Sequence, residues 1–201
     1  MQMRTVARVG ESFVNDIRMT WYGRPILNVI DAFAGGHGIT KVGRSATVGD
    51  EIDQGANLFL WAEAVFVPSA FRSGSSARTD QLASDQIRLT VPFGSSHDEA
   101  TVHFANGHPS RFSARRHKGV GTSKIWWHVD YSDWYLSEEI WVPRHLEVKW
   151  EDEPRPWLSL EVDGFAANVE VDRRLQEVAA LIQRARVGSS HPPGIHHRNG
   201  A

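Results

Sequence analysis

The chain has 201 residues, of which 22 are Lys or Arg and 24 are Asp or Glu, so its formal net charge is −2. This near-neutral balance argues against a dedicated nucleic-acid-binding protein, which needs a basic surface to hold the phosphate backbone. With 41% hydrophobic residues the chain can form a core, and its lack of cysteine excludes disulfides, thiolate nucleophiles and cysteine-rich metal sites.

Apolar side chains recur at every second position along most of the chain, which predicts a series of short strands. In chain order the alternating sets are Phe13, Ile17, Met19 and Trp21; Val29, Asp31 and Phe33; Ile87, Leu89 and Val91; Ala100, Val102 and Phe104; Phe112 and Ala114; Ile125, Trp127 and Val129; Leu146, Val148 and Trp150; and Leu158, Leu160 and Val162. Such a repeated period of two is typical of an antiparallel sheet that buries one face.

One hairpin can be placed in register from its side chains. It consists of the segments 99–105 and 109–115, on either side of Asn106-Gly107-His108. A two-residue Asn-Gly turn would set unlike side chains opposite each other, whereas a three-residue loop sets Val102 against Phe112. We therefore expect the three-residue loop.

The first segment with a helical period covers about residues 51–66. Asp50 is a candidate N-cap, Asp53 falls in the first turn, and Pro68 is expected to end the helix. Residues 58–67 are apolar nearly all round, which predicts a helix buried in the core.

A second helix is predicted over about residues 172–186, ending before Gly188. Its apolar stripe consists of Leu175, Val178, Ala179 and Ile182. We expect a single domain over residues 1–187, followed by a flexible tail over 188–201 that is rich in turn-forming residues. The fold class predicted is mainly β with two helices: a curved antiparallel half-barrel wrapped around the buried first helix, plus a C-terminal amphipathic helix. Such a sheet leaves a cavity beside the helix unless aromatic side chains fill it.

The N-terminal sequence contains no apolar run that could serve as the core of a signal peptide. The most apolar stretch, residues 56–71, is interrupted by Glu63 and Pro68 and is too short to span a bilayer. We therefore expect a cytoplasmic protein without a membrane span.

Several segments resemble an uncharacterised bacterial family of unknown function. The resemblance covers residues 17–162 and is carried by ILNVIDAF–GGHG, LFLWAEAVFVPSAF, VHFANGHPSRFSARR, WWHVDYSDWY and EIWVPRHLEVKWED. By position the family pattern falls on Asp31, Gly36, Glu63, Pro68, Tyr131, Pro143 and Trp150. The strand order is also similar to the half-barrel of bacterial lipoprotein carriers, which shelters acyl chains. The resemblance implies a fold and carries no reaction.

Glu63 is the residue that departs most sharply from its surroundings. Its neighbours at helical spacing are apolar, so its carboxylate is either paired or shifted toward the protonated form by desolvation. In the first case it forms a structural ion pair with Arg24, Arg44 or Arg88. In the second it acts as a general acid or base, or as a polar anchor in an apolar cavity.

Asp31 and His37 are the other two candidate catalytic residues. Asp31 shares a strand face with Val29 and Phe33, where it either cooperates with Glu63 or accepts backbone hydrogen bonds from the following Gly-Gly turn. His37 is a loop histidine that either forms a carboxylate–imidazole pair with Asp31 or is simply solvated.

A histidine-only metal site is not expected. His97, His103 and His108 are close in sequence, but the derived hairpin does not bring them to one face. No nucleotide-binding glycine motif is present, so we expect no cofactor. Arg115 and Arg116 are interpreted as solvated charges.

Aromatic residues supply the candidate ligand-binding set: Phe59, Trp61, Trp127, Tyr131 and Trp150. They line a pocket in one interpretation and plug the core in the other. His128, Tyr131 and Tyr135 offer hydrogen-bonding groups to orient the polar part of a ligand.

These observations favour a protein that binds a small hydrophobic or lipid-like molecule between the curved sheet and the buried helix. The alternative is a cofactor-free lyase, isomerase or cyclase acting on a hydrophobic metabolite, with Glu63 as acid or base. A third possibility is a protein-interaction module that uses exposed tryptophans. The sequence leaves the ligand and the oligomeric state open.

Overall fold

The computed structural model describes residues 1–22, 24–67 and 76–189, which form twelve strands and two helices. All strand pairs are antiparallel, so the expectation of a mainly β protein with two helices is confirmed. The strands are divided between two sheets, however, and do not form the single curved sheet that was expected. The alternation of side chains identifies strands but carries no information on which strands pair.

The five-stranded sheet contains the first five strands in sequence order. These are β1 (Gln2–Arg8), β2 (Ser12–Trp21), β3 (Arg24–Ala34), β4 (His37–Val42) and β5 (Ser45–Thr47). The seven-stranded sheet is also a simple meander, in the order β12-β11-β10-β9-β8-β7-β6. Its strands are β6 (Arg78–Ala83), β7 (Gln86–Phe93), β8 (Ser96–Ala105), β9 (His108–His117), β10 (Lys124–Ser137), β11 (Ile140–Trp150) and β12 (Leu158–Glu161).

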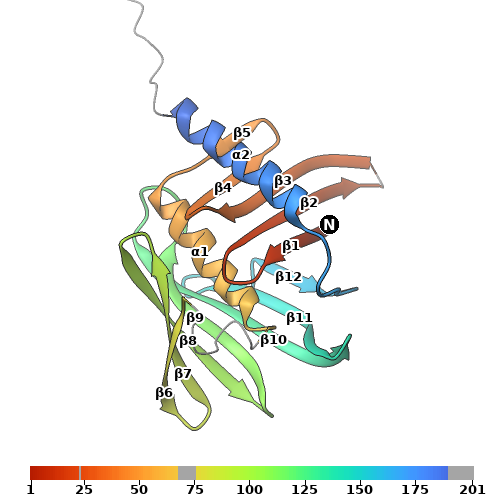
Figure 1. Cartoon of the computed structure of the whole chain (residues 1–201). Helices are drawn as coiled ribbons and strands as arrows, with labels where there is room; N and C mark the ends of the chain where they lie inside the picture. Colours follow the sequence, from red (N-terminus) through yellow and green to blue (C-terminus); the bar gives the residue numbers. More distant parts are fainter. Residues whose placement is uncertain (23, 68–75, 190–201) are drawn as a thin grey trace, which may run out of the picture.

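Helix α1 (Asp50–Ala64) lies between the two sheets (Figure 1). As expected, most of its side chains are buried. The predicted N-cap was wrong: the capping position is Gly49, whose φ of 143° suits glycine, and Asp50 is the first helical residue. The helix ends at Ala64, earlier than predicted, and Pro68 lies outside the described residues.

Helix α2 (Asp172–Ser189) covers the other face of the five-stranded sheet (Figure 1). Its buried residues Leu175, Val178 and Ile182 belong to the predicted stripe. The predicted stop at Gly188 was wrong, because the helix continues through this exposed glycine to its last residue, Ser189. Residues 190–201 of the expected tail lie outside the described residues. No helix in the described ranges is long and apolar enough to cross a membrane.

The core consists of three clusters that follow this layering. One joins α1 to the inner face of the seven-stranded sheet, a smaller one joins α1 to Phe13 and Phe33 of the five-stranded sheet, and the third joins α2 to the outer face of that sheet. Helix α1 therefore buries opposite sides against different sheets, which explains why its sequence is apolar nearly all round.

The β8–β9 hairpin confirms the predicted strand register but not the predicted turn. Val102 pairs with Phe112, as the side chains indicated. The turn has only two residues, Asn106 and Gly107, with φ values of 52° and 79° that are typical of a type I′ turn. A bulge next to Phe104 absorbs one residue and restores the register, which is why the shorter turn is compatible with matched side chains.

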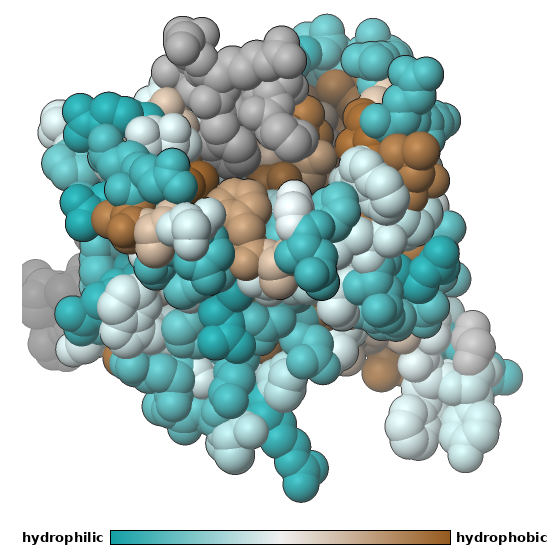
Figure 2. Space-filling model, turned by 90° about the horizontal axis from the view of Figure 1, so that it is seen from below, coloured by the Kyte–Doolittle hydropathy of each residue, from teal (hydrophilic) through white to brown (hydrophobic). Residues whose placement is uncertain are grey.

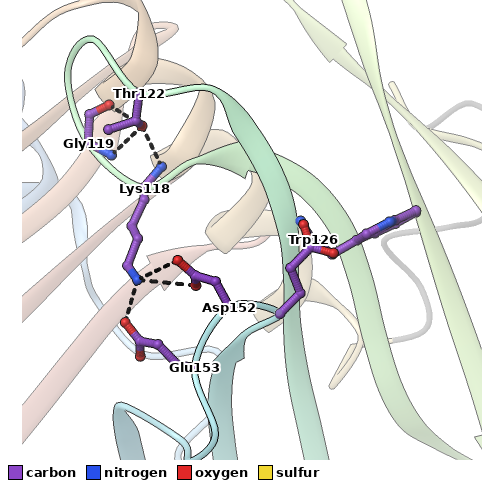
Figure 3. A network of polar contacts seen from close by, with 7 residues as sticks. Lys118, Gly119, Thr122, Trp126, Asp152 and Glu153 are labelled. Carbon is purple, nitrogen blue, oxygen red and sulfur yellow. Dashed lines mark hydrogen bonds and ion pairs between the residues drawn. The ribbon is translucent and has the colours of Figure 1, made fainter.

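Charged loops tie together one end of the seven-stranded sheet (Figure 3). Lys118, after β9, contacts the carboxylates of Asp152 and Glu153, which follow β11. Thr122 Oγ1 accepts hydrogen bonds from the backbone N–H groups of Lys118 and Gly119, both at 3.1 Å. This network holds the end of the sheet that carries Trp150.

Candidate functional site

A cavity of about 1850 Å³ lies between the two sheets, beside the C-terminal half of α1. Its walls come from β1, β2 and β3, from α1, from β10, β11 and β12, and from the segment 163–171 that leads to α2. The apolar lining includes Ile17, Val29, Phe59, Leu60, Phe66, Val129, Leu146, Val148 and Leu160. Exposed charged residues, among them Arg4, Arg18 and Glu161, also line it and mark its opening to solvent.

The molecular surface shows the same contrast. Viewed from below, hydrophobic residues gather in the upper half of the view around a recess, while most of the remaining face is hydrophilic (Figure 2). A large contiguous apolar surface on a protein usually indicates a binding site for a ligand, a protein or a membrane, so this recess is a candidate binding site.

Glu63 lies in the wall of this cavity. The residue as a whole is half-buried, but its Oε2 atom is fully buried and has no hydrogen-bond partner among the described residues. None of the predicted arginine partners (Arg24, Arg44 or Arg88) forms an ion pair with it. Burial raises the pKa of Glu63 to about 8, so the carboxyl group is protonated and neutral at pH 7.

Tyr131 lines the cavity close to Glu63 and is itself anchored to α1. Its hydroxyl donates a hydrogen bond of 2.8 Å to the carbonyl oxygen of Ala62. Burial, followed by the nearby Glu63 carboxyl, raises the pKa of Tyr131 well above its usual value. The phenol is therefore neutral, and its hydrogen bond to Ala62 holds it against the turn of α1 that contains Glu63.

Asp31 does not join Glu63. It lies on the inner face of β3, where it interacts with Thr40 on β4 and faces the buried Arg116 of β9. Burial raises the pKa of Asp31, and the hydrogen bond from Thr40 and the charge of Arg116 oppose this rise. Among the described residues, the Asp31 side chain interacts with Thr40 and Arg116 and not with the Gly-Gly turn, so it contributes to a contact between the two sheets.

Arg116 contradicts its interpretation as a solvated charge. Its guanidinium carbon lies 4.8 Å from the ring centroid of Trp127 and 5.5 Å from that of Trp150. A Cβ atom at Gly55 would lie 2.4 Å from its Nη2, so glycine at this position of α1 makes room for the guanidinium. The signal was present in the sequence: Arg116 continues the inner-face series of Phe112 and Ala114.

His37 pairs with Asp53 and not with Asp31. Its Nδ1 lies 3.0 Å from Asp53 Oδ2, while Asp53 Oδ1 accepts a 2.7 Å hydrogen bond from the backbone N–H of Gly38. Arg186 of α2 donates to both Asp53 oxygens, at 3.1 and 2.9 Å. Sequence reasoning placed Asp53 only in the first helical turn, because nothing near it in the chain identifies Arg186 as its partner.

The five predicted binding aromatics separate into two groups. Phe59 and Tyr131 line the cavity. Trp61, Trp127 and Trp150 are buried core residues that do not line it. Trp127 and Trp150 instead form the aromatic surface on which Arg116 rests.

The remaining predicted polar groups lie away from the cavity. His128 Nδ1 lies 2.8 Å from Ser113 Oγ on the outer face of the seven-stranded sheet, and Tyr135 contacts Arg144. His108 stacks on Trp134, with ring centroids 5.1 Å apart. In the part of the chain that the structure describes, no three His, Asp or Glu side chains are placed to hold a metal ion.

Comparison with known proteins identifies the family. Residues 1–160 match the model of a family of unknown function, DUF6544. The chain belongs to this family. The resemblance seen in the sequence is thereby confirmed, and the DUF6544 match includes both sheets and α1 but not α2. No curated protein and no solved structure matches the chain.

Proposed function

We propose that the protein binds a small hydrophobic or lipid-like molecule in the cavity between its two sheets. The observation that carries this proposal is the carboxyl group of Glu63, which lines the cavity beside Phe59 and Leu60 and has a buried oxygen with no hydrogen-bond partner among the described residues. Burial without a partner is unfavourable for a polar group, and a ligand that supplies the missing partner removes that penalty.

The size of the cavity points to an elongated or bulky ligand. Pockets for drug-sized molecules usually have volumes of about 300–1,000 Å³. The volume here is about 1850 Å³, and the lining combines aliphatic side chains with the aromatic rings of Phe59, Phe66, Tyr131 and Phe165. These features favour a molecule with a long or multi-ring apolar body over a compact polar metabolite.

Glu63 would orient the polar end of that molecule. As a neutral acid it can donate a hydrogen bond to a carbonyl, ether or hydroxyl oxygen, which a carboxylate cannot do. Deprotonation above about pH 8 removes the donor and places a charge in the apolar wall. Ligand affinity should therefore fall as the pH rises through this value, whereas Glu63→Gln should retain it.

The first experiment is native mass spectrometry of the freshly purified protein, with extraction and identification of any bound molecule. We expect one apolar adduct per chain. In parallel, the neutral fluorescent probe N-phenyl-1-naphthylamine tests the cavity itself. Val29→Trp, which places an indole ring in the cavity, should weaken probe binding, while Val120→Trp at an exposed loop position should not. Equal probe binding by both variants, with a clean apo mass, would overturn the proposal.

The same site supports a second candidate, a cofactor-free enzyme. A carboxyl group with a pKa of about 8 is protonated near neutral pH and matches the requirements of a general acid. Asp31 and His37 do not assist it, since both point to other partners. Once the bound compound is known, Glu63→Gln separates the two functions: a carrier retains affinity unchanged, whereas an enzyme retains affinity and loses turnover.

A further inference from the structure

The β2–β3 hairpin ends in a two-stranded ribbon that extends beyond its neighbours. The pairing of β1 with β2 begins at Arg18, and β4 pairs with β3 only from Val29. Beyond these points, Met19, Thr20 and Trp21 of β2 pair with Leu27, Pro25 and Arg24 of β3, and neither β1 nor β4 pairs with them (Figure 1). The end of this ribbon, which we call the hairpin tip, comprises residues 18–22 and 24–27.

The hairpin tip exposes large apolar side chains. Trp21 is 68% exposed and Tyr22 is 92% exposed, with their rings in an edge-to-face contact at 5.3 Å between centroids. Ile26 is 61% exposed and Met19 is 37% exposed. Isolated apolar residues on a surface are ordinary, but four on one projecting ribbon expose hydrophobic area that folding does not bury.

The charged residues of the hairpin tip, Arg18 and Arg24, are both cationic. Arg18 and Arg24 form no ion pair in the described structure, and the sequence contains no Asp or Glu between Asp16 and Asp31. Arg18 is paired across the strands with the uncharged residues Gln2 and Asn28. The aromatic and aliphatic end is thus flanked by two free cations.

We propose that the hairpin tip docks on the surface of a phospholipid bilayer that contains anionic lipids. Tryptophan and tyrosine favour the interface between head groups and acyl chains, because their rings have both apolar and polar parts. Arginines beside them are attracted by anionic head groups. A protein partner would have to complement a narrow ribbon exposed on both sides, whereas a bilayer surrounds such a ribbon without specific shape.

The position of the hairpin tip relates this docking to the cavity. Arg18 and Asn28 line the cavity, and the next residue pair along the ribbon is Met19–Leu27. Docking would therefore bring the cavity opening next to the bilayer, and an apolar ligand would exchange without crossing water. This use of the docking rests on the proposed function, but the docking itself does not.

The test is flotation of the purified full-length chain with vesicles of phosphatidylcholine, with and without phosphatidylglycerol. We expect binding to the anionic vesicles that weakens with salt. The double substitution Trp21→Ser with Tyr22→Ser should reduce affinity about tenfold or more. Arg18→Gln and Arg24→Gln should each reduce it about fivefold, on anionic vesicles only. Trp126→Ser, at an exposed tryptophan on the other sheet, is the matched control and should bind as the parent does.

Two outcomes would overturn the inference. The first is failure of the parent chain to float with anionic vesicles, and the second is equal flotation of the double variant and the parent. Analytical sedimentation of the parent and the double variant tests for self-association. If the parent self-associates, the variant does not, and neither binds vesicles, the hairpin tip contacts a second copy of the chain and the inference is wrong. Val29→Trp should still bind vesicles, and the double variant should still bind the fluorescent probe, so failure of this inference is distinct from failure of the proposed function.

Discussion

Helix α1 carries two buried carboxyl groups, Asp53 near its start and Glu63 near its end, and their surroundings are opposite. Asp53 receives hydrogen bonds from Gly38 and Arg186 and lies beside His37. Glu63 has a buried oxygen without a partner and lies in the wall of a cavity. One helix therefore holds a carboxylate saturated by donors and a carboxyl group left unsatisfied.

The contrast shows how burial alone fails to identify a functional acid. At Asp53 the protein supplies every partner, and those partners come from β4 and α2, so the contacts fasten both helices to the five-stranded sheet. Glu63 Oε2 has no hydrogen-bond partner among the described residues, and a buried polar atom in this state carries an unfavourable free energy that a ligand can relieve. The predictions below test this division.

The largest expected effect is the pH dependence that Glu63 imposes on stability. Its pKa rises from 4.5 in the unfolded chain to about 8 in the folded protein. Between these values the unfolded chain has released the proton and the folded protein retains it, so the free energy of unfolding falls as the pH rises. The loss is on the order of 5 kcal/mol across this window.

Urea unfolding of the parent and of Glu63→Gln at a series of pH values measures this effect. The glutamine variant lacks the titration, so the difference between the two curves isolates Glu63 from all other groups. Parallel curves between pH 4.5 and about pH 8 would show that Glu63 has an ordinary pKa and is not desolvated in the folded protein.

Asp53→Ala should destabilise the protein by about 3 kcal/mol, because it removes the acceptor of the Gly38 N–H and the carboxylate that pairs with Arg186. Thermal or urea unfolding measures the change. Asp50→Ala, in the same helical turn but exposed, is the matched control and should change stability by less than about 1 kcal/mol. Similar losses in both variants would contradict a specific role for the Asp53 contacts.

Gly38→Ala should cost about 2 kcal/mol, because β4 approaches α1 too closely for a side chain. A Cβ atom at residue 38 would lie 2.8 Å from both the Ala56 Cβ and the backbone oxygen of Ile52. Gly119→Ala has open space around the added methyl group and serves as the control in the same unfolding measurement. A neutral Gly38→Ala would mean that the Asp53 end of α1 is less tightly fixed than its contacts indicate.

The two ends of α1 also differ in how much the sequence revealed. Glu63 could be identified because a carboxyl group among apolar neighbours violates the helical pattern of its own segment. Whether it had a partner depended on strands far away in the chain. Asp53 could not be identified, since Arg186 lies in a different helix and an acid in a first turn is common.

The strands show the same limit. Cross-strand side chains were sufficient to place Val102 opposite Phe112, but not to detect the bulge that allows a two-residue turn. Arg116 lay on the predicted inner face and was still taken for a solvated residue, because charge suggested exposure. Its burial depends on Trp127, Trp150 and Gly55, which pack together only once both sheets and α1 are assembled.

The smallest expected effect concerns Tyr131, which contacts α1 next to Glu63 and also lines the cavity. Tyr131→Phe removes one hydrogen bond, from the hydroxyl to the carbonyl oxygen of Ala62, and should lower the free energy of unfolding by about 1 kcal/mol. Affinity for N-phenyl-1-naphthylamine should not change, because the hydroxyl is already committed to α1. The opposite result, unchanged stability with weaker probe binding, would make Tyr131 a ligand-contacting group and would place the polar end of the cavity on β10 as well as on α1.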